Sequence, residues 1–350
     1  MQENQKYLIT GGCGFIGSAV IRYLIKDQKN KVLNIDKLTY SSNPLAVEID
    51  KSNNYSHKEI DISDTKSIKN IINSFEPDYI INLAAESHVD RSIDNPQEFI
   101  FSNIVGSYVM LNEGYLYWKE LNGSKKETFR FLQISTDEIY GSTKDTFNEK
   151  SLINPNSPYA ASKGSSDLLS RAWYKTYNFP VLITNCSNNY GKWQYPEKLI
   201  PLCIKKCLTQ DFIPIYGSGN QERDWIHVDD HVKGMLLVLN QGSIGERYNI
   251  ASGKSTKNID IVNLICSYFD EHMPLDKGKY SDLIEYVDDR PGHDFRYSMD
   301  IGKIRSELSW EPTISFEDGI KKTIKWYLEN KDWLMDPKIV SYKGERLGQI

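Results

Sequence analysis

The sequence is poor in cysteine, in long apolar runs and in positive charge. None of its five cysteines forms a Cys-x-x-Cys pair, so neither a disulfide framework nor a zinc cluster is indicated. No stretch reaches the roughly 18 consecutive apolar residues of a membrane-spanning helix. The first residues, MQENQKYLIT, lack the basic and apolar regions of a signal peptide. We therefore expect a cytoplasmic protein with no membrane partner and no resident metal.

The charge balance excludes a second class of partner. A formal net charge of −5 argues against nucleic acid, because a nucleic-acid partner requires a basic face. Any anionic ligand must therefore be bound by local cations. The sequence also lacks internal repeats and Pro- or Gly-rich linkers. Its 350 residues suffice for one large domain or for two closely joined ones.

The stretch KYLITGGCGFIGSAVIRYLIKD predicts an apolar strand, a glycine turn and an amphipathic helix. Gly11, Gly14 and Gly17 permit a tight turn, close approach of a pyrophosphate to the backbone, and close packing of the helix on the strand. A second strand, KVLNID, ends in Asp36. A carboxylate there accepts hydrogen bonds from the adenosine ribose and repels a 2′-phosphate, so NAD is favoured over NADP.

Two further apolar segments continue the alternation of strands and helices. One ends near Asp61 and Ile62, and the other at Ala84 and Ala85, whose small side chains admit a flat cofactor. We therefore expect an α/β protein with a Rossmann-type doubly wound parallel sheet. An aromatic-rich helix over 99–118 follows, and its apolar stripe suits either the core or a subunit interface.

Residues 131–163 carry a concentration of acid, base and nucleophile chemistry. A buried strand is expected to end near Ser135. Thr136, Asp137 and Glu138 follow directly, at the strand end where open α/β sheets bind their ligands.

Tyr159 and Lys163 lie four residues apart in a helix expected to start at Asn156-Ser157-Pro158, so both side chains share one face. An ammonium beside a phenol lowers the pKa of the phenol and turns it into a usable base. The spacing alone is also common in surface pairs. The Tyr159–Lys163 pair points to a site because it follows, along the chain, the strand end that carries Thr136, Asp137 and Glu138.

The chain after residue 181 predicts one more strand and then a less regular cap for the substrate. Lys198, Arg223, Arg290 and His293 are cations that could hold a diphosphate, although each alone suits a solvated surface.

Two other spacings in the cap region have simpler explanations than a metal. His227 and His231 share a helix face, with Asp229 expected to cap that helix. Cys203 and Cys207, one helical turn apart, are expected to pack in the core. A last amphipathic helix should start at Ser315.

These blocks together resemble the extended short-chain dehydrogenase/reductase family, and within it the dTDP-glucose 4,6-dehydratases. The resemblance covers about residues 6–330 through GGCGFIG, LAAESHVDRSI, STDEIYG, SPYAASK, TNCSNNYG, PEKLIP, RDWIHVDDH and DRPGHD. The specific block is STDEIYG, because related epimerases generally lack the Asp-Glu pair. Cys13 stands where the family commonly has alanine, and Lys37 stands where a neutral residue is frequent.

The resemblance implies a reaction in which NAD oxidises carbon 4 of dTDP-glucose, water leaves across carbons 5 and 6, and the hydride returns to carbon 6. Tyr159 would take the 4-hydroxyl proton, with Thr136 bonded to the same oxygen and Lys163 lowering the tyrosine pKa. Glu138 would remove the carbon 5 proton, and a protonated Asp137 would protonate the leaving hydroxyl. The product would enter deoxysugar synthesis, for example of rhamnose.

The resemblance also implies the contacts with cofactor and substrate. Cofactor contacts fall on Gly11, Gly14, Phe15, Ile16, Gly17, Asp36, Lys37, Leu38, Thr39, Asp61, Ile62, Leu83, Ala84, Ala85, Ser102, Tyr159, Lys163 and Asn189. Substrate contacts fall on Ser87, Thr136, Asn188, Glu197, Lys198, Leu199, Pro214, Tyr216, Arg223, Asn258, Arg290 and His293.

The expected organisation is an NAD-binding domain over 1–185 that carries the catalytic residues, and a smaller α/β domain over 186–350 that mainly binds the nucleotide sugar. The chain would cross between the two, and a homodimer is implied through the helices around 99–118 and 157–178. Three other functions stay open: a 4,6-dehydratase for a UDP- or CDP-linked sugar, a nucleotide-sugar 4-epimerase, and a non-catalytic NAD-binding sensor.

Overall fold

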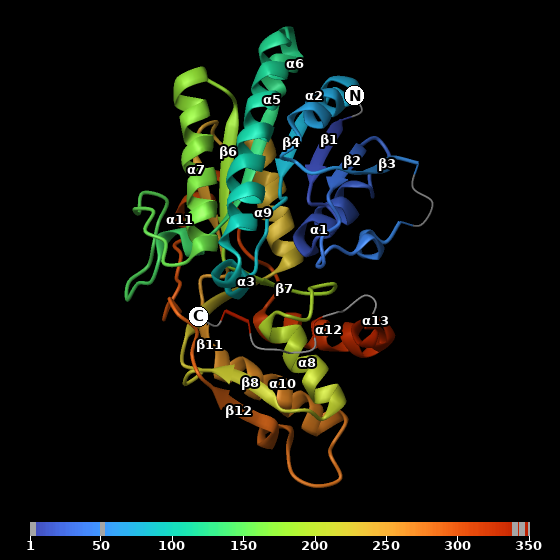
Figure 1. Ribbon diagram of the computed structural model, residues 1–350, viewed down its shortest axis with the longest axis vertical. Coiled ribbons are helices and arrows are strands. Elements are labelled where there is room, and N and C mark those ends of the chain that lie inside the picture. Colours follow the sequence, from blue (N-terminus) through green and yellow to red (C-terminus); the bar gives the residue numbers. More distant parts are fainter. Residues whose placement is uncertain (1–4, 50–52, 338–341, 343–346, 349–350) are drawn as a thin grey trace.

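The computed structural model describes residues 5–49, 53–337, 342 and 347–348. Within this part of the chain, seven parallel strands form one large sheet (Figure 1). Their order is β10-β6-β5-β4-β1-β2-β3. The first three strands of the chain extend from β1 toward one edge of the sheet, and the later strands extend from β4 toward the other edge. The predicted Rossmann-type doubly wound fold is thereby confirmed. The strands are β1 (Lys6–Thr10), β2 (Lys31–Asp36), β3 (Tyr55–Glu59), β4 (Tyr79–Asn82), β5 (Arg130–Thr136), β6 (Val181–Cys186) and β10 (Arg247–Ile250).

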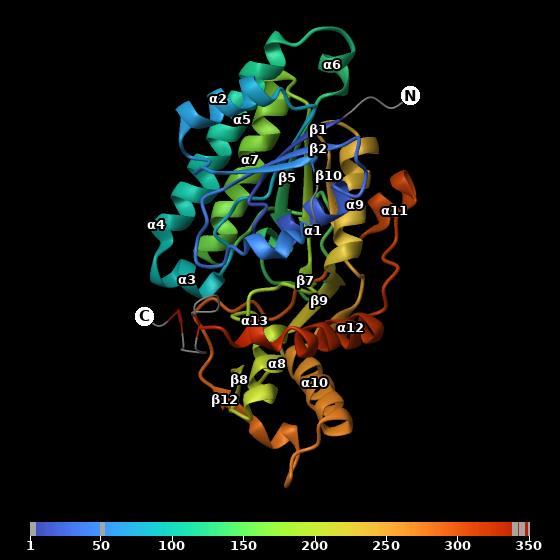
Figure 2. The same cartoon turned by 90° about the vertical axis from the view of Figure 1, so that its right-hand side faces the viewer.

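Helices cover both faces of the large sheet (Figure 2). One face is covered by α2 (Thr65–Phe75), α5 (Gly106–Glu120) and α7 (Pro158–Tyr177), and the other by α1 (Phe15–Leu24), α9 (Val228–Gln241) and α11 (Gly302–Leu308). Both faces of the strands are therefore buried: Ile9 packs in the cluster that contains Val20, and Leu8 in the one that contains Ile72. This double burial explains why the strands are almost continuously apolar.

The rest of the chain forms a smaller lobe at the carboxyl ends of the large sheet's strands (Figure 1). We use this name for two small sheets and the helices around them. The lobe comprises β7 (Asn188–Tyr190), β9 (Glu222–His227), β11 (Ser255–Lys257), β8 (Ile213–Tyr216), β12 (Ile284–Val287), α8 (Leu199–Thr209), α10 (Asn258–His272), α12 (Phe316–Glu329) and α13 (Lys331–Met335).

Short elements connect these parts. They are η1 (Pro44–Val47), α3 (Val89–Asp94), α4 (Pro96–Phe99), η2 (Ile100–Val105), α6 (Gly123–Thr128), η3 (Asp137–Tyr140) and η4 (Tyr280–Leu283). After residue 186 the chain enters the smaller lobe and then returns, through α9 and β10, to the edge of the large sheet. The division of function at residue 185 stays a prediction.

Three local predictions are tested by the helix boundaries. The starts of α7 and α12 are confirmed, because Ser157 and Ser315 are the N-caps and each hydroxyl accepts a backbone N–H. The continuous helix predicted over 99–118 is wrong in detail, since residues 100–105 form a π-helical turn. The cap predicted at Asp229 is also wrong: the cap is His227, whose Nδ1 accepts from the Asp229 N–H at 3.2 Å.

None of the described helices combines the length and the apolarity that crossing a membrane would require.

Candidate active site

A cavity of about 580 Å³ opens between the large sheet and the smaller lobe. Every predicted catalytic and substrate-binding residue lines it, and so does every predicted cofactor-binding residue except Leu38. Leu38 instead donates its backbone N–H to Asp36 at 2.8 Å, in the left-handed conformation (φ 54°). The structure therefore brings together segments from across the chain, while the roles of the individual residues remain predictions.

The glycine turn after β1 forms one wall of the cavity. Gly11 has φ 69°, and a Cβ there would lie 2.7 Å from the Cα of Ala84. A Cβ on Gly17 would collide with the carbonyl oxygen of Gly11. The N-cap of α1 is Gly14, which has no side chain to satisfy the first N–H groups of the helix. These N–H groups are at the cavity and fit a pyrophosphate.

Asp36 ends β2 beside the same wall. Its buried carboxylate accepts hydrogen bonds from the N–H of Cys13 (2.9 Å), the N–H of Leu38 (2.8 Å) and the hydroxyl of Ser42 (3.0 Å). These contacts fix the carboxylate against the glycine turn. A fixed negative charge at this strand end fits a ribose with free hydroxyls better than a ribose 2′-phosphate.

Lys37, the residue that departs from the family pattern, is held by anionic neighbours. Its Nζ donates to Ser102 Oγ at 2.7 Å and lies 3.5 Å from Glu86 and 4.0 Å from Asp61. Two carboxylates thus offset the lysine charge. The π-helical turn contributes to this arrangement because it carries Ser102.

The acid-base residues leave the end of β5 together. Thr136 Oγ1 lies 3.1 Å from Asp137 Oδ1 and hydrogen-bonds the phenol oxygen of Tyr159. Within the described residues, Asp137 Oδ2 is buried and has no hydrogen-bond partner. Burial and the neighbouring Glu138 raise the pKa of Asp137 well above its ordinary value, which favours the protonated form of this carboxyl.

Glu138 has a different environment, although it is the next residue. Burial raises the pKa of Glu138, but Arg290, Arg223 and Lys198 oppose this increase. The pKa of Glu138 is still raised on balance, but three cations reduce the increase, whereas the neighbouring Glu138 adds to the increase at Asp137. The two carboxyls can thus take opposite protonation states, which an acid and a base require.

Tyr159 and Lys163 project from the first turns of α7, but their pairing differs from the prediction. Lys163 Nζ donates to the carbonyl oxygen of Ile134 at 2.6 Å. The pKa of Tyr159 is raised well above its usual value by burial and by Glu138. The predicted lowering of the tyrosine pKa by Lys163 is therefore wrong for the chain by itself, in which burial raises this pKa.

Asp167, which the sequence analysis missed, lies one turn beyond Lys163 on α7. It is fully buried, 3.2 Å from Arg247 Nη2, and accepts from Asn185 Nδ2 at 3.1 Å. Its charge raises the pKa of Lys163 against the effect of burial. Asp167 thus offsets part of the cost of burying the charge of Lys163, and the helical spacing from Lys163 could have indicated it.

Cations from the smaller lobe occupy the other end of the cavity. Arg223 lies over the ring of Tyr297 at 4.3 Å and donates to the backbone carbonyl oxygen of Asp294 at 2.9 Å. Among the described residues, Arg290 Nε is buried without a hydrogen-bond partner. The prediction that His293 is a further cation is wrong, since burial and Arg290 lower its pKa to about 4.

A second missed residue, Asp90, organises this end of the cavity. Its carboxylate accepts from Arg290 Nη1 at 2.7 Å and from the hydroxyl of Tyr216 at 3.1 Å. Both partners are predicted substrate-binding residues. Asp90 lies inside the block LAAESHVDRSI, so its position, but not its long-range partners, was visible in the sequence.

The histidines considered as metal ligands have other contacts. His231 is fully buried, and its Nδ1 lies 2.8 Å from Asn189 Oδ1. Because Asn189 lines the cavity, His231 orients a predicted cofactor-binding residue. His227 caps α9 instead of facing a common ligand with His231.

Comparison with known proteins gives the family. The family model described as GDP-mannose 4,6 dehydratase matches residues 8–323. A dTDP-glucose 4,6-dehydratase of Escherichia coli is 48% identical over 360 residues, covering 99% of this chain and 99% of the relative. One from Haemophilus influenzae is 48% identical over 330 residues, covering 92% and 98%.

Solved structures agree with these relatives. The chain is similar to DesIV, a dTDP-glucose 4,6-dehydratase from Streptomyces venezuelae with NAD and TYD bound (TM-score 0.85, 38% identity, 94% of this chain and 98% of that chain). It is also similar to UDP-glucose 4-epimerase from Thermotoga maritima with UDP-glucose (TM-score 0.82, 27% identity, 93% and 100%). The chain belongs to the dTDP-glucose 4,6-dehydratases, within the extended short-chain dehydrogenase/reductase family.

Proposed function

We propose that the protein is a dTDP-glucose 4,6-dehydratase, a hydro-lyase that converts dTDP-glucose to dTDP-4-keto-6-deoxyglucose and water. One observation carries the proposal beyond the family resemblance. Asp137 and Glu138 are adjacent carboxyls at one cavity, yet the pKa of Asp137 is raised well above its ordinary value by burial and by Glu138, whereas three cations limit the increase that burial causes in the pKa of Glu138. Elimination of water requires an acid and a base on the same substrate.

NAD supports the reaction by accepting a hydride from carbon 4 of the sugar and returning it to carbon 6. The glycine turn, the first turn of α1 and Asp36 would hold the dinucleotide, as their fit to a pyrophosphate and a ribose indicates. Lys163 would hold the nicotinamide ribose. Its position is fixed by the carbonyl oxygen of Ile134 at 2.6 Å.

The chain's own residues then move the protons. Tyr159 takes the 4-hydroxyl proton, and Thr136, which contacts the phenol, orients the same oxygen. Glu138 removes the proton at carbon 5, which the neighbouring ketone has made acidic, and would return a proton to carbon 5 when the hydride is returned to carbon 6. Asp137 donates its proton to the departing 6-hydroxyl. The pKa of Tyr159 is raised in the chain alone, and the positive charge of a bound NAD+ would favour the deprotonated phenol.

The substrate diphosphate would lie among the cations of the smaller lobe. Arg223 and Arg290 carry guanidinium groups whose planar donors suit phosphate oxygens, and Lys198 adds a third charge. Asp90 holds Arg290 in place. His293, neutral at physiological pH, would act as a hydrogen-bonding group.

We also propose a homodimer formed through the helices around residues 99–118 and 157–178. Large apolar side chains are exposed on these segments, although such side chains are usually covered. The helices α5 and α7 lie side by side along one flank of the molecule (Figures 1 and 2). The exposed side chains are Ile100, Phe101, Tyr108, Leu116, Leu168 and Tyr177. The cytoplasmic location remains a prediction.

The test of the activity is mass spectrometry of dTDP-glucose after incubation with the purified protein, without added cofactor. Loss of one water, with one deuteron retained when the solvent is deuterium oxide, would support the whole cycle and a bound NAD. An unchanged substrate mass, also after adding NAD+, would contradict the proposal. UDP-glucose and CDP-glucose in parallel separate the nucleotide alternatives, and a 4-epimer of unchanged mass would indicate an epimerase.

A further inference from the structure

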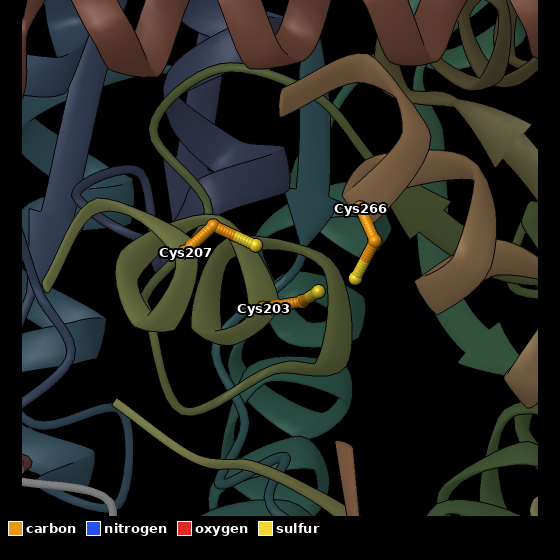
Figure 3. A group of neighbouring side chains, drawn as sticks. All are labelled: Cys203, Cys207 and Cys266. Atoms are coloured by element: carbon orange, nitrogen blue, oxygen red, sulfur yellow. The ribbon is translucent and has the colours of Figure 1, made fainter. Parts of the chain in front are cut away.

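Three of the five cysteines meet in the core of the smaller lobe. Cys203 and Cys207 project from α8, one helical turn apart, and Cys266 projects from α10 toward them (Figure 3). Their sulfur atoms all lie within 4.8 Å of one another, and all three side chains are buried. No other group of three or more His, Cys, Asp or Glu ligand atoms lies this close together in the described chain.

The geometry is close to that of three sulfur ligands around one ion. A metal–thiolate bond of about 2.3 Å places three sulfurs in a plane about 4 Å apart, so small side-chain movements would suffice. The group offers sulfur alone, with neither an imidazole nor a carboxylate as a fourth ligand. Soft thiolate ligands select Cu(I), zinc and iron–sulfur clusters. Structural zinc sites and iron–sulfur clusters use four protein ligands, so three sulfurs alone favour Cu(I).

The surroundings restrict the charge that the site can carry. Buried apolar side chains, among them Ile204, Ile265 and Phe269, belong to the same core cluster as the thiols. A single thiolate and a monovalent cation form a neutral pair, and neutrality minimises the cost of burying charge in an apolar core.

We propose that Cys203, Cys207 and Cys266 form a site for one soft monovalent cation of the Cu(I) class between α8 and α10. The ion would join two helices whose first residues, Leu199 and Asn258, both line the substrate end of the cavity. It would therefore stabilise the smaller lobe without entering the chemistry. The site is independent of the proposed dehydratase activity.

The test uses the full chain, reduced and freed of metal, and titrated anaerobically with Cu(I) against a chromophoric Cu(I) chelator. We expect one Cu(I) per chain, a thiolate-to-copper absorption, and a higher thermal midpoint. Cys207→Ala or Cys266→Ala should weaken the affinity by ~100-fold or more, since loss of even an outer partner costs ~10–100-fold. Cys13→Ala is the matched control and should keep the stoichiometry.

A second measurement needs no variant. In the wild-type chain, Cu(I) should slow alkylation of Cys203, Cys207 and Cys266, followed by mass spectrometry of their peptides, but not that of Cys13 or Cys186. Because the thiols are buried, the titration is repeated with Cu(I) present during refolding. Absence of retained copper under both conditions would overturn the proposal. So would equal binding by the variant in which all three cysteines are alanine.

Discussion

At the scale of the residue, the proposed chemistry depends on the different environments of two adjacent carboxyls, Asp137 and Glu138. Asp137 is almost fully buried and faces a negative neighbour, while Glu138 faces three cations. The contrast predicts that the two carboxyls can be removed separately, each with its own defect. Tyr159 is expected to act in an earlier step, the oxidation at carbon 4, so the order of the steps can be followed through the oxidation state of the nicotinamide.

Glu138→Gln should allow the oxidation at carbon 4 and slow the loss of water by ~100-fold or more, the usual contribution of a general base. NADH should therefore accumulate in a single turnover followed by fluorescence. Tyr159→Phe is the matched control and should form no NADH, because its defect precedes the hydride transfer. Undiminished deoxysugar formation by Glu138→Gln would contradict the role of that carboxylate.

Asp137→Asn should slow elimination by ~100-fold or more and also stabilise the fold at neutral pH. The folded chain raises the pKa of Asp137, whereas the unfolded chain leaves it near 3.9. Above that pH the Asp137 carboxyl ionises in the unfolded chain, whereas burial keeps it from ionising in the folded chain. The free energy of unfolding therefore falls as the pH rises toward the pKa of the folded chain. Each pKa unit of difference between the folded and the unfolded chain changes the free energy of unfolding by about 1.4 kcal/mol.

Denaturant unfolding at pH 4 and pH 8 would measure this effect. The stability advantage of the asparagine variant should be small at the lower pH and larger at the higher one. An advantage independent of pH would mean that Asp137 is not held protonated.

At the scale of the element, α7 links folding to catalysis because its N-cap lies two residues before Tyr159. The hydroxyl of Ser157 accepts the N–H of Ala160 at 3.1 Å, and that of Ser315 accepts the N–H of Asp318, also at 3.1 Å, at the start of α12. Ser157→Ala and Ser315→Ala should each cost about 1 kcal/mol of stability.

Only Ser157→Ala should slow NADH formation, by ~10-fold or more, since displacing a reacting group by about 1 Å costs ~100-fold. Stopped-flow measurement of both variants at saturating substrate would separate the effects. Equal hydride-transfer rates in the two variants would show that the cap matters for stability alone.

At the scale of the whole molecule, the apolar flank of α5 and α7 is the surface through which we propose that the protein dimerises. Leu168→Lys, at a side chain 55% exposed in the single chain, should shift the protein from dimer to monomer in light scattering after gel filtration, because a charge would be buried at the interface. Leu152→Lys, at a residue 84% exposed and outside these helices, is the control and should remain dimeric. A monomeric wild-type protein would refute the proposed dimer.

Much of the fold and site was predictable because the signals are local. Alternating apolar strands and helices, Gly11 and Gly17 in the turn, and Asp36 at a strand end all lie within short stretches. The spacing of apolar residues in a strand or helix, and the residue types that a tight turn requires, are both set within such short stretches. The clustering of the acid-base residues was also predictable, since parallel strands end at one edge of a sheet.

The sequence by itself therefore determined the doubly wound sheet, the glycine turn and the residues that gather at the cavity. Only the tertiary structure decided their partners and charges. Asp90 meets Arg290 across 200 residues of chain, Lys163 bonds the backbone of β5 instead of acting on Tyr159 alone, and His293 is neutral. No periodicity encodes such contacts, and burial, which sets the pKa of each group, arises only when separate segments pack together.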